Sequence, residues 1–260
     1  MRISIITPSY NQGEYIEDTI RSVMNQNYND LEHIVIDGGS TDETVSILRK
    51  YPHLNWISEK DSGQGNAINK GFKMATGGVL AWLNSDDFYE SNILGEVNRY
   101  FESHEDCAVL YGDITYVDSL GKILYKVEGD TINYQTLSDY PDIVRQPSCF
   151  WRSRVVNELG GLDEHLHLVM DLDFFLRVGK KYKFHYLGRN LSYYRTYSEN
   201  KTRSMLARQA LEIYRVYRRE RITLNGRRLG FLLLRILDSV GLGQPIRSAM
   251  KFVRSAAKTT

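Results

Sequence analysis

Cysteines and long apolar runs are both scarce in this chain of 260 residues. Its two cysteines, Cys107 and Cys149, have no CxxC spacing, so disulfide-stapled folds and thiolate metal sites are poor interpretations. No leader with a small-residue cleavage region is seen at the start, so we expect the protein to stay in the cytosol. Repeats and low-complexity segments are absent as well. With 42% apolar and 25% charged side chains, the composition predicts a soluble globular protein with a sizeable core.

Acidic and basic side chains are distributed unevenly, although the formal net charge is only +1. Residues 1–200 hold 29 Asp and Glu against 19 Lys and Arg, whereas residues 201–260 hold 3 against 14. A segment with such an excess of one sign is a separate electrostatic unit. We therefore predict a main domain over residues 1–200 and a basic amphipathic helical extension over residues 201–260.

Short apolar runs alternate with segments of helical spacing in the first third of the chain. The apolar runs predict buried parallel strands at residues 2–7, 33–38, 55–58 and 79–84. The segments between them predict helices at residues 15–26, 44–51 and 65–75. Ser40 and Glu43 have the spacing of a capping box before the second helix. This alternation predicts an α/β fold with a doubly wound, mainly parallel sheet and helices on both faces.

Polar residues follow all four predicted strands. Sheets of this kind bind ligands beyond the carboxyl ends of their strands, so these residues are the first candidates for a site. They include Tyr10, Asp37, Asp61 and Asp86. Further along, two apolar runs flank the turn sequence DSLGK and predict a hairpin. A helix is then expected to start near Asp171.

Five motifs resemble, in their order and spacing, those of family 2 glycosyltransferases. They are TPSYNQGEYI, VIDGGSTDET, SEKDSGQGNAINKGF, WLNSDD, and QPSCF followed by MDLDFFLRVG. The likeness covers roughly residues 2–200. It implies the Rossmann-like GT-A fold and inverting transfer from a nucleotide sugar, of the type found in bacterial cell-surface polysaccharide assembly.

The resemblance implies that the sequence Asn84-Ser85-Asp86-Asp87 presents a divalent cation. Such a cation stabilises the charge that grows on a diphosphate leaving group. Hard carboxylate oxygens suit Mg²⁺ or Mn²⁺, so Asp86 is expected as the metal ligand with Asp87 in support. Asn84 and Ser85 are expected to contact the donor. Capping of a following helix is the structural alternative for both aspartates.

The resemblance places the nucleotide across the first three strand ends. Asp37 is expected to accept a hydrogen bond from a uracil N–H, and Asp61 to contact the base from the next loop. A carboxylate can accept from an imide N–H but not from the bare ring nitrogen of cytosine, which favours a UDP-sugar. Lys70 is a candidate for neutralising the diphosphate. An Asx turn at Asp37 and a solvated position for Lys70 are the alternatives. The first strand end is expected to contribute Thr7, Pro8 and Tyr10 to the donor site, with Pro8 and Tyr10 lining the base.

An inverting transfer needs a base that removes the proton of the acceptor hydroxyl. The resemblance places this base at Asp171, where Met170 replaces the glutamate familiar in the family. Without that like-charged neighbour, its basicity has to come from partial burial. Simple N-capping is the alternative for Asp171, and Asp173 is expected to be structural or to serve the acceptor site. His165 and His167 are expected to be loop residues rather than a metal pair.

The basic extension contains two amphipathic segments, residues 210–222 and 227–243. The second is too short and too charged to span a bilayer of ~30 Å. It predicts an interfacial helix that holds the enzyme on the cytoplasmic face of the membrane, beside lipid-linked acceptors. A helical cap on the domain and a dimer contact are the alternatives. Nucleic acid is not an expected partner, because no recognised nucleic-acid-binding fold accompanies the charge.

The sequence therefore predicts a metal-dependent inverting hexosyl- or N-acetylhexosaminyltransferase. The expected reaction moves a sugar from a UDP-sugar to a hydroxyl of a saccharide or lipid-linked acceptor. Two other functions fit part of the pattern. A polyprenyl-phosphate glycosyltransferase would use a phosphate acceptor and need no base. A non-catalytic scaffold subunit would bind nucleotide sugars, but would not need both Asp86 and Asp171.

Overall fold

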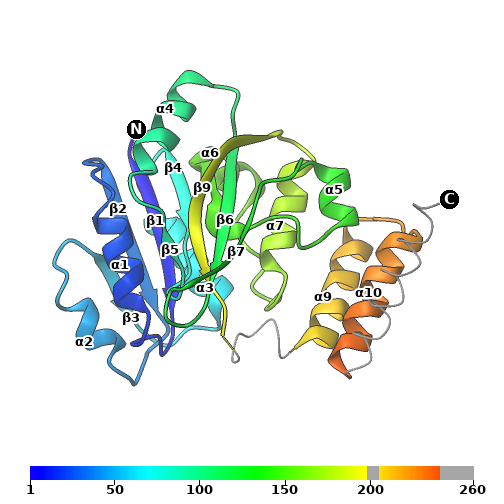
Figure 1. Cartoon of the computed structure of the whole chain (residues 1–260), viewed down its shortest axis with the longest axis horizontal. Helices are drawn as coiled ribbons and strands as arrows, with labels where there is room; N and C mark the ends of the chain where they lie inside the picture. The colour runs from blue at the N-terminus through cyan, green and yellow to red at the C-terminus, as the bar shows by residue number, and fades with distance from the viewer. Residues whose placement is uncertain (198–204, 241–260) are drawn as a thin grey trace.

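The computed structural model describes residues 1–197 and 205–240. Within these residues the strands form one mixed sheet in the order β3-β2-β1-β4-β8-β6-β9-β5, and β7 pairs with β6 (Figure 1). The strands are β1 (Ile3–Ser9), β2 (Leu31–Asp37), β3 (Asn55–Ser58), β4 (Val79–Trp82), β5 (Phe88–Tyr89), β6 (Val109–Val117), β7 (Ile123–Val127), β8 (Cys149–Arg152) and β9 (Phe184–Arg195). The helices are α1 (Ile16–Met24), α2 (Thr44–Leu48), α3 (Gln64–Met74), α4 (Leu94–Ser103), α5 (Tyr134–Asp139), η1 (Gln146–Ser148), α6 (Ser153–Leu159), α7 (Met170–Gly179), α9 (Leu206–Arg219) and α10 (Gly226–Ser239).

The four strands predicted in the first third of the chain are confirmed as β1 to β4, and all of them are parallel. Side chains of β2 alternate between two cores, as the twofold repeat of a strand requires. Ile34 and Ile36 pack with Ala67 of α3, whereas Val35 packs with Ile16 of α1 on the other face. Their carboxyl ends therefore lie at one edge of the sheet, between helices on both faces.

The predicted hairpin is confirmed in the antiparallel pair β6 and β7. Asp118 closes its turn by accepting hydrogen bonds from the amides of Leu120 and Lys122, each at 2.9 Å. Gly121 adopts a φ of +81°, a conformation that glycine reaches at no steric cost. β8 and β5 are also antiparallel to their neighbours, so the second half of the sheet is mixed.

The predicted capping box of Ser40 and Glu43 is wrong. Ser40 turns its hydroxyl toward Asp37 rather than toward the amides of α2. The amide of Thr44 instead donates to the Asp42 carboxylate at 3.0 Å. Asp42 thus accepts the hydrogen bond at the start of α2 that the spacing had predicted for Ser40.

Helices α9 and α10 pack on the main domain beside α5 and α7, at the end of the molecule opposite β3 (Figure 1). Ile213, Tyr217 and Leu232 belong to the same buried core as Trp151 of β8. The expected separation at residue 200 therefore does not divide the core, and the alternative of a helical cap is confirmed for these helices. Residues 201–204 and 241–260 of the predicted extension lie outside the described residues.

Arginines of these two helices pair with carboxylates of the main domain. Arg219 pairs with Asp163 at 2.6 Å and also with Asp173. Arg228 pairs with Asp139 at 2.9 Å. Part of the basic charge of α9 and α10 is therefore paired with carboxylates of the main domain. In the described part of the chain, no helix combines the length and apolarity needed to cross a membrane.

The docking of α10 can be tested with two adjacent leucines. Leu232 is buried with 6% of its surface exposed, whereas 49% of Leu233 is exposed. We expect Leu232→Ala to lower the free energy of unfolding by about 2–5 kcal/mol, because it leaves a cavity in the shared core. Leu233→Ala should change it by less than about 0.5 kcal/mol. Urea denaturation measures both, and equal small effects would mean that α10 is not docked.

Candidate active site

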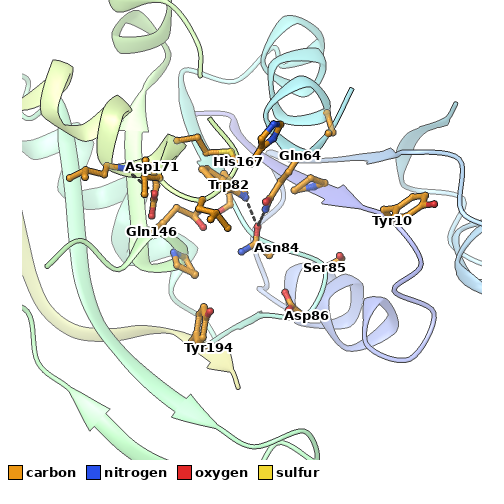
Figure 2. A pocket seen from close by; sticks show the side chains of 18 of the residues that line it. Tyr10, Gln64, Trp82, Asn84, Ser85, Asp86, Gln146, His167, Asp171 and Tyr194 are labelled. Atoms are coloured by element: carbon orange, nitrogen blue, oxygen red, sulfur yellow. Dashed lines mark hydrogen bonds between the residues drawn. The ribbon is translucent and has the colours of Figure 1, made fainter. Parts of the chain in front are cut away.

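A single elongated cavity of about 1110 Å³ opens at the carboxyl ends of the parallel strands. Figure 2 shows Tyr10 at one end and Asp171 at the other, with Asn84, Ser85 and Asp86 between them. The residues predicted for the site that line this cavity are Pro8, Tyr10, Asp61, Asn84, Ser85, Asp86 and Asp171. The fold thus brings together residues that are far apart in the sequence.

The end of the cavity near Tyr10 is shaped by a close approach between two strand-end loops. The Asp61 carboxylate lies against Gly38, where a Cβ atom would come within 3.0 Å of Oδ2. Asp61 Oδ1 accepts a hydrogen bond from the amide of Gly63 at 2.8 Å. Tyr10 is 62% exposed and presents a ring at the mouth. This end offers an aromatic surface and a fixed carboxylate that can accept an N–H.

Asp37 is not among the residues that line the cavity, although its neighbours Gly38 and Gly39 are, and its predicted contact with the base stays a prediction. Its carboxylate is fully buried and accepts hydrogen bonds from the amides of Gly39 and Ser40, at 3.1 and 2.9 Å. The hydroxyls of Ser40 and Ser58 also donate to it. These four donors occupy both carboxylate oxygens, which confirms the alternative of an Asx turn.

Thr7 and Lys70 are not among the residues that line the cavity, and their predicted contacts with the donor stay predictions. Thr7 is buried, with its hydroxyl 3.0 Å from Nε2 of His33. Burial lowers the pKa of His33 to about 3, so this histidine stays neutral. Lys70 pairs with Glu59 at 2.6 Å. Lys60, which the sequence analysis did not select, lines the cavity.

Asp86 is the aspartate of the acidic motif that faces the cavity. Its Oδ2 accepts a hydrogen bond from the hydroxyl of Tyr197 at 2.8 Å. Burial raises its pKa above the usual range, because little water remains to stabilise the charge. Within residues 1–197 and 205–240, no group of three or more His, Cys, Asp and Glu side chains could hold a metal alone. One carboxylate completed by phosphate oxygens is, however, an arrangement that Mg²⁺ commonly uses.

Asp87 is buried and Asn84 lines the cavity, and hydrogen bonds from both hold the motif in place. Asp87 is 1% exposed and accepts hydrogen bonds from the amide of Arg195 at 3.0 Å and from Nδ2 of Asn84 at 3.3 Å. Burial and the nearby Asp86 raise its pKa well above the usual range. Oδ1 of Asn84 accepts from Trp82 and Gln64. The element that follows is strand β5, so helix capping is wrong for both aspartates.

Asp171 is the second residue of α7 and not its N-cap, which is Val169. Its Oδ1 accepts the amide of Leu172 at 2.9 Å. Burial first, and the charge of Asp142 second, raise the pKa of Asp171 to about 6. A carboxylate with this pKa is largely ionised at neutral pH yet accepts a proton more readily than an ordinary aspartate.

Asp173 lies on another side of α7 and is structural. It is 1% exposed and pairs with Arg177 at 3.1 Å and with Arg219. His167 is a loop residue, as expected, but it also lines the cavity. His165 is an exposed residue of the same loop.

Several cavity residues were missed by the sequence analysis. They are Lys60, Gln64, Arg145, Gln209, Ile213 and Arg235. Gln209 and Ile213 belong to α9, and Arg235 belongs to α10. Helical spacing predicted these two helices, but spacing does not say which other element a helix face meets. Residues of the extension therefore form one wall of the cavity.

Comparisons with known proteins agree with this arrangement. The model of the family described as glycosyl transferase family 2 matches residues 4–160. An uncharacterized glycosyltransferase of Rickettsia bellii is 28% identical over 186 residues, which cover 68% of this chain and 27% of that relative. The chain spans a third or less of the length of the first two curated relatives it matches.

Two solved structures share the fold at low sequence identity. Residues 1–349 of S. aureus TarS, in complex with UDP-GlcNAc, give a TM-score of 0.70 at 20% identity and cover 92% of this chain and 73% of that one. The mannosyltransferase PcManGT of Pyrobaculum calidifontis, in complex with GDP-Man and Mn²⁺, gives 0.65 at 15% and covers 100% and 81%. The expected GT-A fold is thereby confirmed.

Proposed function

The chain belongs to glycosyl transferase family 2, and we propose that it is an inverting enzyme that moves a sugar from a UDP-sugar to a hydroxyl of a saccharide or lipid-linked acceptor. The expected setting is cell-surface polysaccharide assembly. One observation carries the proposal. One cavity joins an end with Asp61 and Asp86 to an end with a carboxylate, Asp171, whose pKa is raised to about 6.

The donor nucleotide lies at the Tyr10 end of the cavity. The Asp61 carboxylate accepts the imide N–H of uracil, and Tyr10 and Pro8 pack against the ring. The complex of TarS with UDP-GlcNAc supports this choice. Guanine also presents a ring N–H, and PcManGT was solved with GDP-Man, so the choice between the two bases needs a direct test.

Asp86 fits a divalent cation, Mn²⁺ or Mg²⁺. It supplies a hard oxygen ligand, and its buried carboxylate gains most from a nearby positive charge, since burial disfavours its ionised form. When bound, the cation stabilises the negative charge that develops on the leaving diphosphate. Asn84 and Asp87 hold the backbone of the motif so that Asp86 points into the cavity.

Asp171 acts as the general base at the opposite end. The acceptor oxygen attacks the anomeric carbon while the bond from that carbon to the diphosphate oxygen breaks, and Asp171 takes the hydroxyl proton. This single displacement inverts the anomeric configuration. A hydroxyl acceptor is favoured over a lipid phosphate, because an ionised phosphate has no proton to lose and gains nothing from a base with a raised pKa. A scaffold subunit likewise has no use for such a base.

A surface of α10 points away from the domain and suits a membrane. Leu229, Leu233, Ile236 and Val240 form an exposed apolar stripe at helical spacing. Arg215 and Arg218 are exposed residues of α9, the helix that packs against α10. Apolar side chains flanked by arginine fit an anionic lipid surface. Because Arg235 of the same helix lines the cavity, a lipid-linked acceptor would meet the active site there.

The donor and metal assignments can be tested in one assay. The protein is incubated with UDP-GlcNAc, UDP-glucose, UDP-galactose, GDP-mannose and dTDP-glucose, with and without Mn²⁺, and release of nucleoside diphosphate is measured. We expect release from a UDP-sugar only when a divalent cation is present. Asp86→Ala should reduce it roughly a hundredfold, the scale for loss of one electrostatic stabiliser. Asp106→Ala, an exposed carboxylate outside the cavity, should not. Release from GDP-mannose alone would replace the uridine assignment.

The base can be tested by mutation and by pH. Because the active form of Asp171 is ionised, we expect kcat/KM for the acceptor to fall tenfold per pH unit below about pH 6. An ordinary aspartate would hold activity down to about pH 4. Asp171→Asn should lower transfer about 10²–10⁴-fold and leave UDP affinity, measured by calorimetry, unchanged. Transfer near the wild-type rate would show that the base lies elsewhere.

The membrane surface can be tested by sedimentation with phosphatidylglycerol vesicles. We expect the full chain to bind them in a salt-sensitive way, and the double variant Leu233→Ser/Ile236→Ser to bind about tenfold or more weakly. The matched control, Ile123→Ser/Leu124→Ser, changes two exposed apolar residues of the hairpin and should bind normally. Equal binding by all three proteins would remove this surface from the proposal.

A further inference from the structure

A buried glutamate of α9 holds the backbone that leads to Asp171. Glu212 is 2% exposed, and its Oε2 accepts hydrogen bonds from the amides of His167 and Leu168 at 3.0 and 2.8 Å. Both amides belong to the loop that enters α7 just before Asp171. A single carboxylate oxygen of one helix therefore fixes two consecutive peptide groups of this loop.

A second contact joins α9 to helix α7, at a residue just after Asp171. The guanidinium of Arg219 pairs with the buried carboxylate of Asp173 and, at 2.6 Å, with Asp163. Glu212 and Arg219 lie two turns apart on the same helix. Together they contact the chain on both sides of Asp171. Helix α9 therefore restrains the loop before this residue and the first turn of α7, which contains it.

The burial of Glu212 is costly unless the carboxylate is paired. Its partners are the two amides and the guanidinium of Arg208, at 3.3 Å from Oε1. Hydrogen bonds to an ionised group are among the stronger ones in proteins, so this carboxylate can order the loop. The start of α7 has Val169 as its N-cap and shows no side-chain cap within the described residues. Asp163 holds the amide of His165 within the loop, whereas the amides of His167 and Leu168, the two closest to α7, are held by α9.

We propose that Glu212 is a positioning residue for Asp171. By holding residues 167 and 168 it keeps the Asp171 carboxylate aimed into the cavity and at hydrogen-bonding distance from the acceptor oxygen. This inference rests on the proposed function for the role of Asp171 as the base. α9 lies beyond residues 4–160, which match the family model, so this device belongs to the extension of this chain.

The test compares two substitutions of nearly equal volume. Glu212→Gln keeps an oxygen that can accept from both amides, whereas Glu212→Met keeps the bulk and removes the acceptor. With UDP-GlcNAc and Mn²⁺, release of UDP with water as the acceptor is expected to fall about ten- to a hundredfold in Glu212→Met, the scale for small misplacement of a catalytic group. Glu212→Gln should stay within about threefold of wild type. UDP affinity by calorimetry should be unchanged in both.

Hydrogen exchange gives a readout that does not depend on activity. In Glu212→Met the amides of residues 165–172 should exchange faster, while the strands at the nucleotide end keep their protection. Leu211→Met is the matched control, because Leu211 neighbours Glu212 on α9 but is 48% exposed and does not line the cavity. It should change neither the exchange nor UDP release. Arg219→Gln provides an independent variant should Glu212→Met fail to fold, with the same loss of rate expected.

Each other outcome has a distinct meaning. A wild-type rate in Glu212→Met, or a loss in Glu212→Gln as large as in Glu212→Met, would overturn the positioning role. Loss of UDP affinity together with rate would reduce Glu212 to a structural residue. If Asp171→Asn keeps its activity, the proposed base is wrong, and unchanged exchange at residues 165–172 in Glu212→Met would then refute the loop contact independently.

Discussion

Charge pairing between the acidic main domain and the arginines of α9 and α10 is the interaction on which the rest of the site depends. Asp139 and Asp173 are almost fully buried, and a buried carboxylate is tolerated only with a partner. Arg228 and Arg219 provide that partner from the C-terminal helices. Asp173 has a second partner in Arg177 of α7, whereas both arginines that pair with Asp139 come from α10. The extension is therefore packed as part of the same body, and its residues Gln209, Ile213 and Arg235 line the cavity.

The two ends of the cavity follow different structural rules. The nucleotide end is built from loops at the carboxyl ends of parallel strands, which the sheet places side by side. The end with Asp171 is built from helices α7 and α9, held together by side-chain contacts between distant parts of the chain. Burial at this second end raises the pKa of Asp171, so the same packing that positions the carboxylate also makes it a better base.

Two motifs each contain a pair of aspartates, and in each motif the two side chains lie in different surroundings. Asp86 faces the cavity, whereas Asp87 is tied to the backbone of Arg195. Asp171 faces the cavity, whereas Asp173 is tied to two arginines. Two residues apart on a helix means about 200° of rotation, which explains the second pair. In each motif one carboxylate lines the cavity, while the other makes hydrogen bonds or ion pairs within the protein.

The α/β fold and the four parallel strands could be predicted from local patterns, because strand alternation and turn residues depend on near neighbours along the chain. The roles expected of Asp61, Asp86 and Asp171 came from the resemblance of their motifs to those of family 2 glycosyltransferases. Only the tertiary structure shows that the Asp37 carboxylate accepts hydrogen bonds within its own turn and that Lys70 pairs with Glu59. It also decided that α9 and α10 close the cavity. An amphipathic pattern says that a helix has an apolar face, but only the packed fold decides which surface that face meets.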